Sequence, residues 1–222
     1  METQPILLLA SSSPRRRQLL ALGGWMFGIE VANIDETRRP AEDPAVYVRR
    51  LAEEKARAVL PRAHPDHVII GADTSVVIDS DVLGKPASVE EAYQMLVRLR
   101  SRTHQVFTGI AVLRVSDARL WSEVVITDVP MRAYSDAEID HYIQTGDPMD
   151  KAGAYGIQNP YFQPVATGEM AGCYASVMGL PLCSLTVLLR QAGITPRADG
   201  PRNCQATINY QCPVFQSILS AE

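Results

Sequence analysis

The stretch Ile6-Leu-Leu-Leu-Ala10-Ser-Ser-Ser-Pro14-Arg-Arg-Arg17-Gln-Leu-Leu20 decides the fold class of this 222-residue chain. Its apolar start predicts a buried strand. Ser13 is a good helix N-cap and Pro14 suits the first helical position, so a helix should follow the serine-rich turn. A buried strand that leads through a serine-rich turn into a helix suits the α/β domain that the length of the chain permits.

Three consecutive arginines, residues 15–17, fall in the first turn of the predicted helix. Cations are disfavoured at this positive end of the helix dipole by a few tenths of a kcal/mol to about 1 kcal/mol each. The free N–H groups of a turn and a helix start form an anion site, and added guanidinium groups indicate a ligand with several negative charges, such as a polyphosphate. The alternative is a solvated basic turn whose carboxylate partners lie elsewhere.

Length and charge limit the class of protein. The 222 residues permit one large α/β domain or two lobes that share a sheet. The formal net charge of -4 argues against a nucleic-acid-binding surface. No apolar run approaches the roughly 20 residues needed to cross a bilayer, and the first apolar run reaches Pro14 too soon to resemble a secretory signal. We therefore expect neither nucleic acid nor membrane as a partner.

The four cysteines lie in the last quarter of the chain and lack CxxC spacing. They are expected to be reduced thiols of a cytoplasmic protein, with a Cys204–Cys212 disulfide as the alternative. The four histidines do not complete a zinc ligand set with them.

Hydrophobic periodicity and capping residues divide the rest of the chain into elements. Strands are expected over 27–31 and 68–79, as a hairpin over 104–115 and 121–134, and as shorter pieces within 165–177. Helices are expected over 44–60, from a capping box at Ser88, from a second capping box at Ser135 to Gly146, and over 181–193. Residues 147–160 form a glycine-rich loop. Residues 1–194 are interpreted as one domain, and 195–222, with weak periodicity, as a C-terminal extension of unknown role without a defined element.

Asp73 lies inside the apolar strand Val68-Ile-Ile-Gly-Ala-Asp-Thr-Ser-Val-Val-Ile78. An ionised carboxylate there is costly unless it is paired or bound to a cation. Gly71, two residues earlier, allows another group to approach the backbone closely. A metal ligand or general base is favoured over a structural aspartate that caps a neighbouring turn, because buried unpaired aspartate is rare.

Three more charged residues are ambiguous when each is taken alone. Lys55 occupies a core-facing helix position, where the commoner outcome is a stem that reaches solvent and the alternative is a phosphate contact in a cleft. Glu36 lies in a polar loop and is either solvated or, with Asp73, a ligand of a Mg²⁺-type ion. Lys85 is either a turn lysine or a phosphate contact.

The segment Asp150-Lys-Ala-Gly-Ala-Tyr-Gly-Ile-Gln158 has small residues that let backbone amides face a ligand. The amide of Gln158 can present both a donor and an acceptor to a base edge. The alternative is an ordinary glycine-rich connection. His104 alternates with Val106 on its strand and is interpreted as structural.

Taken together, the charged residues favour one reaction type. The chain has no Ser-His-Asp spacing, GxSxG elbow or Walker A pattern, so acyl transfer and P-loop chemistry have no support. Basic groups for phosphates, combined with acidic groups for a metal and a water, suit metal-assisted attack on a phosphate ester or anhydride.

The ordered set of motifs resembles the Maf family of nucleoside triphosphate pyrophosphatases. The resemblance covers about residues 6–194 and implies an ITPase-like α/β fold, with an elongated mixed β-sheet and two lobes around a central cleft. The matching segments are residues 10–16, 34–36, 47–52 with Lys55, 70–74, 83–86, 103–109, 150–158 and 179–182.

The resemblance also implies hydrolysis of a nucleoside triphosphate at the α-phosphate, with Mg²⁺ or Mn²⁺, by a homodimer. Asp73 is the implied proton acceptor and, with Glu36, a metal ligand; Lys55 and Lys85 are the implied phosphate contacts. The implied substrate-binding residues are Ser11, Arg15, Arg16, Thr74 and Gln158.

The loop that ends at Gln158 resembles the subfamily acting on dTTP and UTP, with a house-cleaning role against modified pyrimidine nucleotides. Two departures from the family pattern lie near the expected base pocket: Asn159-Pro160 replaces the glycine-rich continuation after Gln158, and Cys173 stands where serine is common. One alternative is a pyrophosphatase for another modified nucleotide, such as 7-methyl-GTP. The other is a non-enzymatic nucleotide-binding regulator of cell division.

Overall fold

The computed structural model describes residues 6–220 of the chain. A mixed six-stranded sheet organises this part, in the order β2-β1-β3-β5-β6, with β4 paired to β3. β1 is parallel to β2 and β3, whereas β4 and β5 are antiparallel to β3, and β6 is antiparallel to β5. The strands are β1 (Ile6–Leu9), β2 (Phe27–Ile29), β3 (His67–Ile78), β4 (Asp81–Leu83), β5 (Thr103–Arg114) and β6 (Arg119–Pro130).

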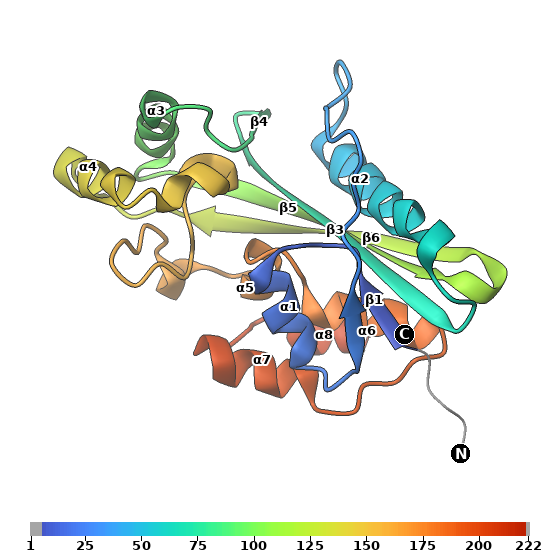
Figure 1. Cartoon of the computed structure of the whole chain (residues 1–222). Helices are drawn as coiled ribbons and strands as arrows, with labels where there is room; N and C mark the ends of the chain where they lie inside the picture. Colours follow the sequence, from blue (N-terminus) through green and yellow to red (C-terminus); the bar gives the residue numbers. More distant parts are fainter. Residues whose placement is uncertain (1–5, 221–222) are drawn as a thin grey trace.

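Three long strands, β3, β5 and β6, give the molecule its elongated shape (Figure 1). Helices α3 and α4 contact each other at one end of these strands, and α2 packs along β3 and β5 nearer the other end. The helices are α1 (Pro14–Ala21), α2 (Pro44–Val59), α3 (Val89–Leu99), α4 (Asp136–Gln144), α5 (Tyr174–Val177), α6 (Leu182–Gln191), α7 (Gly200–Ile208) and α8 (Phe215–Leu219). The predicted mixed α/β fold is confirmed.

Side-chain caps start the helices where the sequence predicts. Ser13 accepts from the Arg16 N–H at the start of α1, and Ser135 forms the complete capping box of α4. The box predicted at Ser88 is only half formed, because the Glu91 carboxylate accepts from the Ala87 N–H instead of the Ser88 N–H.

Two glycines bring α2 unusually close to the sheet. A Cβ added at Gly71 would lie 2.0 Å from the Ala52 carbonyl oxygen, and one at Gly109 would lie 2.3 Å from the Val48 carbonyl oxygen. The close approach predicted at Gly71 is therefore confirmed. It places Lys55, on the next turn of α2, against the middle of β3.

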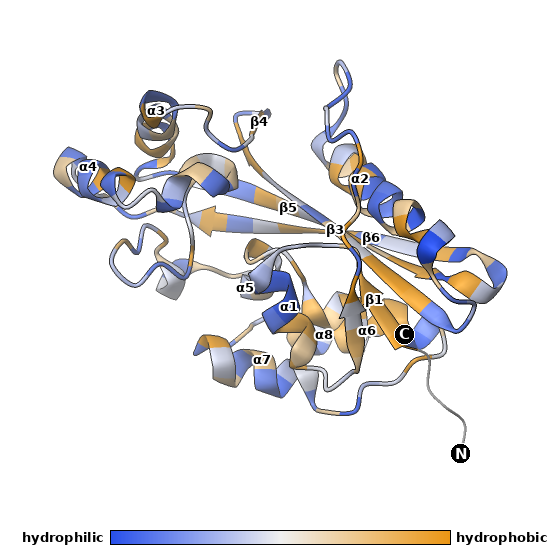
Figure 2. Cartoon of the chain, viewed as in Figure 1, coloured by the Kyte–Doolittle hydropathy of each residue, from blue (hydrophilic) through white to orange (hydrophobic). Residues whose placement is uncertain are grey.

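The hydrophobic core continues from the sheet into the flanking helices. Apolar residues concentrate along β1 and β3 in Figure 2, while the outer sides of α2 and α3 carry polar residues. The core also holds buried residues of α3, α4 and α6, including Leu96, Tyr142 and Leu185. Within residues 6–220, no helix combines the length and the apolar composition that a membrane crossing requires.

Two expectations for the last quarter of the chain are wrong. Residues 165–177 form no strand in a sheet; Val165 makes one isolated bridge with Met131, and α5 follows, capped by the Cys173 sulfur. The tail contains α7 and α8, and both contact α6. Its weak periodicity hid these helices because each is short and rests its apolar side on a preformed surface.

The division into a domain of residues 1–194 and an extension stays a prediction. Residues 1–5 and 221–222, at its two ends, lie outside the described residues. The four cysteines are free thiols, so the alternative Cys204–Cys212 disulfide is not formed.

Candidate active site

A cavity of about 810 Å³ opens where the β1–α1 turn, the middle of β3 and the loop of residues 147–160 meet. This volume lies in the range of small-molecule binding sites. The structure brings every predicted site residue to this cavity. They are Ser11, Arg15, Arg16, Glu36, Lys55, Asp73, Thr74, Lys85 and Gln158.

The buried pair of Lys55 and Asp73 forms the centre of the site. Lys55 Nζ lies 2.7 Å from Asp73 Oδ1 and 2.8 Å from Glu36 Oε1. The exposed fraction is 7% for Lys55 and 8% for Asp73. The interpretation of Lys55 alone, as a stem that reaches solvent, is therefore wrong. The close approach of α2 to β3 instead places its ammonium against the two carboxylates.

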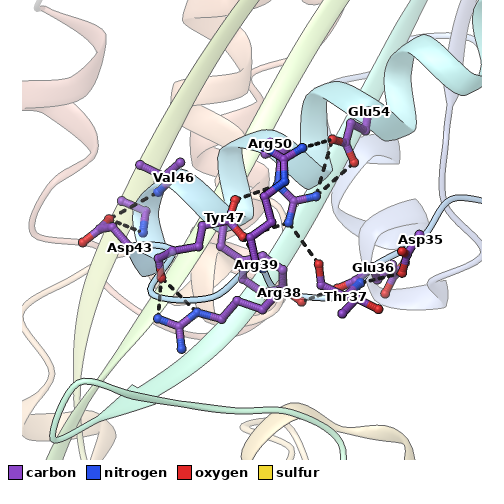
Figure 3. Close-up of polar contacts among 12 residues, drawn as sticks. Asp35, Glu36, Thr37, Arg38, Arg39, Asp43, Val46, Tyr47, Arg50 and Glu54 are labelled. Atoms are coloured by element: carbon purple, nitrogen blue, oxygen red, sulfur yellow. Dashed lines mark hydrogen bonds and ion pairs between the residues drawn. The ribbon is translucent and has the colours of Figure 1, made fainter.

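Glu36 is the exposed member of this group, and a network on α2 holds its loop (Figure 3). The Tyr47 hydroxyl donates to the Glu36 carbonyl oxygen at 2.8 Å, and Arg50 donates to the Thr37 carbonyl oxygen at 3.2 Å. Arg50 also bonds the Glu42 carboxylate at 2.6 and 2.8 Å. These bonds from Arg50 lower the pKa of Glu42 to about 2 despite its burial.

Arg16 joins three distant parts of the site. Its Nε donates to the Gly179 carbonyl oxygen at 3.0 Å, and its two terminal nitrogens donate to Ser11 Oγ and Thr74 Oγ1, each at 3.3 Å. Burial lowers the pKa of Arg16, and the charges of Asp73 and Glu36 oppose that effect. Arg17, the last of the three arginines, is exposed and does not line the cavity.

Lys85 and Gln158 complete the rim of the cavity, and both are exposed. The Gly153 N–H donates to the Gly84 carbonyl oxygen at 3.0 Å, so the glycine-rich loop is tied to the turn that carries Lys85. Gly153 has φ +68°, and a Cβ there would lie 2.9 Å from a Val76 methyl group. A glycine is therefore required at this point of the loop.

Sequence reasoning missed four residues of the site. Tyr47, Asp147, Lys151 and Gly179 all line the cavity. Lys151, with an exposed fraction of 9%, gave a signal, because it is the one cation inside a run of small residues. Gly179 was recognised only as the start of the matching segment 179–182, because its contact with Arg16 spans 163 residues.

The donor set suits a hard cation that binds together with a ligand. Glu36 and Asp73 direct two carboxylates at one point, which the Lys55 ammonium occupies as a cation. No group of three or more His, Cys, Asp or Glu residues in the described part of the chain forms a ready-made metal cage. Mg²⁺ commonly binds through one or two carboxylates plus substrate phosphates and water, so these residues fit such an ion.

The fold and the site define an α/β protein with a cleft for a polyanionic ligand. Comparison with known families identifies this class more narrowly. The model of the family described as "Maf-like protein" matches residues 6–192 of the chain. The chain belongs to this family, as the resemblance predicted.

Several relatives with the name dTTP/UTP pyrophosphatase match most of the chain. The protein of Chlorobium phaeovibrioides is 44% identical over 190 residues, which cover 84% of this chain and 97% of the relative. The Myxococcus xanthus protein is 46% identical over 191 residues, covering 86% and 94%. A dITP/XTP pyrophosphatase structure from Mycobacterium abscessus aligns at 14% identity over 57% of this chain and 74% of that one, with a TM-score of 0.36.

Proposed function

We propose that the protein hydrolyses nucleoside triphosphates to the monophosphate and pyrophosphate, with dTTP and UTP as its main substrates and modified pyrimidine nucleotides as further ones. The observation that carries this proposal is the convergence of the predicted cationic and acidic residues on one cavity, around the buried Asp73–Lys55 pair. The names of the relatives support the same reaction and base.

The cationic residues bind the triphosphate in this proposal. Arg15 and Lys85 lie on the cavity wall, and Arg16 is held rigidly by three acceptors. Guanidinium and ammonium groups offset the charge that builds on phosphate oxygens as the anhydride bond breaks. The ammonium group of Lys55 lies beside Asp73, so in this proposal it places a positive charge next to the attacking water.

Asp73 is the proposed proton acceptor. A water attacks the α-phosphorus, its proton passes to an Asp73 carboxylate oxygen, and the bond to the bridging oxygen breaks to release pyrophosphate. Glu36 and Asp73 would hold Mg²⁺ or Mn²⁺, which when bound polarises phosphate oxygens and makes water more acidic. The structure supports this assignment by the burial of Asp73 on β3 and its direction into the cavity.

The base is read by Gln158 in this proposal. Its amide offers a donor and an acceptor, which complements the acceptor and donor edge of uracil or thymine. The homodimer and the cytoplasmic location that the resemblance implies also belong to the proposal. Size-exclusion chromatography with light scattering tests the oligomeric state.

Pyrophosphate release is the direct test. We would assay dTTP, UTP, CTP and 7-methyl-GTP with Mg²⁺ and with Mn²⁺, and we expect the highest kcat/KM for dTTP and UTP. Asp73→Asn should fold normally and lose about a hundredfold or more in turnover, as expected when a general base is removed. The matched control is Asp128→Asn, an exposed aspartate on β6 whose partner is Gln105.

Two results would contradict the proposal. Turnover of Asp73→Asn at the wild-type rate would exclude Asp73 as the base. Saturable nucleotide binding without pyrophosphate release under either metal would favour the non-enzymatic regulator.

A further inference from the structure

Asp147 is one of the groups that hold the glycine-rich loop that carries Gln158. The loop is also held by the bond from the Gly153 N–H to Gly84 and by the Tyr174 hydroxyl, which donates to the Ile157 carbonyl oxygen at 3.1 Å. Asp147 Oδ2 accepts from the Tyr142 hydroxyl at 2.7 Å and from Asn159 Nδ2 at 3.0 Å. Asp147 Oδ1 accepts from Lys151 Nζ at 2.8 Å. One side chain therefore connects α4, the start of the loop and the residue directly after Gln158.

The fastening extends along the loop. The Gly156 N–H donates to the same Tyr142 hydroxyl at 3.1 Å, and Lys151 Nζ also donates to the Asp147 carbonyl oxygen at 2.7 Å. Tyr142 is 1% exposed. Positions 151, 156 and 159 are thus tied to Asp147 directly or through one hydroxyl, and Gln158 lies between two tied positions.

Asn159 is held from both sides of its amide. Its Nδ2 donates to Asp147, while its Oδ1 accepts from the backbone N–H groups of Tyr161 and Phe162 at 2.9 and 2.8 Å. A flipped amide would lose all three bonds, so one orientation is selected. The ring of Phe162 stacks on Tyr142 with centroids 4.4 Å apart. The residue whose N–H Asn159 accepts from therefore packs against the tyrosine that donates to Asp147.

Asp147 keeps its charge in this setting. Burial opposes its ionisation, but the hydrogen bonds from Lys151, Tyr142 and Asn159 together outweigh burial and lower the pKa of the carboxyl. Hydrogen bonds to a charged acceptor are about twice as strong as those between neutral groups.

Gln158 itself has no such support. It is exposed at the cavity, and within residues 6–220 its amide has no hydrogen-bond partner. The direction of its side chain therefore depends on the backbone on either side of it.

We propose that Asp147 and Asn159 form a clamp that positions Gln158, and that this clamp sets the preference for the uracil or thymine base. The inference rests on the proposed function. Asp147 and Asn159 are positioning residues, and they act through Gln158.

Asn159→Asp is the sharpest test variant. It keeps the side-chain acceptor for the Tyr161 and Phe162 N–H groups but sets a carboxylate against Asp147. We expect kcat/KM for UTP relative to CTP to fall by about tenfold or more, as for lost hydrogen bonding to a substrate. The loss should appear as a higher KM for UTP, while kcat stays within about threefold of the wild-type value.

The double variant Gln158→Ala/Asn159→Asp separates positioning from a general structural role. If Asn159 acts through Gln158, then Asn159→Asp should cause no further loss of base preference in the Gln158→Ala background. Asn159→Ala, which removes the donor without adding charge, makes the same test if Asn159→Asp folds poorly. Melting temperatures of all variants would be measured together.

Asn203→Asp is the matched control. Asn203 lies in α7, away from the cavity, and its side-chain amide donates to the carbonyl oxygen of Leu22 at the end of α1. It should leave the UTP to CTP ratio unchanged. If the wild type is active but the Asn159 variants lose the same factor in kcat/KM for UTP and for CTP, both with Gln158 and in the Gln158→Ala background, the clamp alone would be overturned. A wild type that releases no pyrophosphate would overturn the proposed function, and the clamp with it.

Discussion

Burial determines the pKa of His104. It lies on β5 with Nε2 2.8 Å from the Tyr155 hydroxyl oxygen, and its Nδ1 is buried without a partner. It does not line the cavity. Burial lowers the pKa of His104 to about 4.

This pKa makes the stability of the protein depend on pH. Between about pH 6.5 and 4 the unfolded chain binds a proton at His104 that the folded protein does not, so stability is complete above this window and falls as the pH drops through it. The expected loss reaches about 3 kcal/mol across the window. Urea unfolding at pH 7 and pH 4.5 would measure it.

The variant His104→Gln isolates this contribution, because glutamine does not titrate and can still bond Tyr155. Its unfolding free energy should depend less steeply on pH than that of the wild type. The exposed His141→Gln is the matched control and should follow the wild type. An equal acid loss in His104→Gln would rule out this histidine as the cause.

At the scale of elements, the contact between α2 and β3 places the central charges. Gly71→Ala would put a Cβ 2.0 Å from the Ala52 carbonyl oxygen, and backbone cannot move aside as a flexible side chain does. We expect a loss of stability of about 1–3 kcal/mol, typical of overpacking, and reduced turnover because α2 carries Lys55.

Chemical denaturation and pyrophosphate release would measure both effects in Gly71→Ala. Gly168→Ala is the control, since a Cβ at Gly168 would meet nothing within 4 Å. A variant Gly71→Ala with wild-type stability would show that the helix adjusts more freely than the structure indicates.

Cys212, in the segment between α7 and α8, has the lowest thiol pKa of the four cysteines. A hydrogen bond from Cys173 lowers the pKa of Cys212 below its usual range, whereas burial raises the pKa of Cys183 to about 12 and of Cys204 to about 11. Because the thiolate is the nucleophile, iodoacetamide at pH 7 should label Cys212 first.

Peptide mass spectrometry after a short iodoacetamide pulse would rank the four thiols. Cys173→Ser should change the rate at Cys212, and Cys183→Ser should not. Earlier labelling of Cys183 or Cys204 would contradict the order predicted from their environments.

At the scale of the whole molecule, the tail completes the core without reaching the cavity. The Thr195 carbonyl oxygen accepts from Trp25 Nε1 at 3.1 Å, and the Tyr210 hydroxyl donates to the carbonyl oxygens of Met170 and Gly172 at 2.7 and 3.0 Å. No cavity-lining residue of the described chain lies beyond Gly179.

A chain that ends at Ile194 should therefore be less stable but remain active when folded. Uncovering even one buried apolar side chain costs about 1.5–3 kcal/mol, which corresponds to a fall in Tm of roughly 2–4 °C per kcal/mol at this length. Thermal melting and pyrophosphate release would be compared with a chain that ends at Ser220. An unchanged Tm would mean that α7 and α8 add no stability.

The sequence by itself determined the elements with strong local signals and the kinds of side chain in the site. Capping at Ser13 and Ser135 and the long apolar run around Asp73 are local patterns, so they could be recognised without a structure. Family membership likewise followed from ordered motifs.

Only the tertiary structure decided which of these side chains meet. The pairing of Lys55 with Asp73, the bond from Arg16 to Gly179 and the link between Asp147 and Asn159 join separate segments. Capping and periodicity arise from neighbours along the chain, whereas ion pairs depend on how closely remote backbones pack, as α2 does at Gly71. The helices α7 and α8 of the tail likewise depend on the tertiary structure, because α6 supplies the surface that they cover.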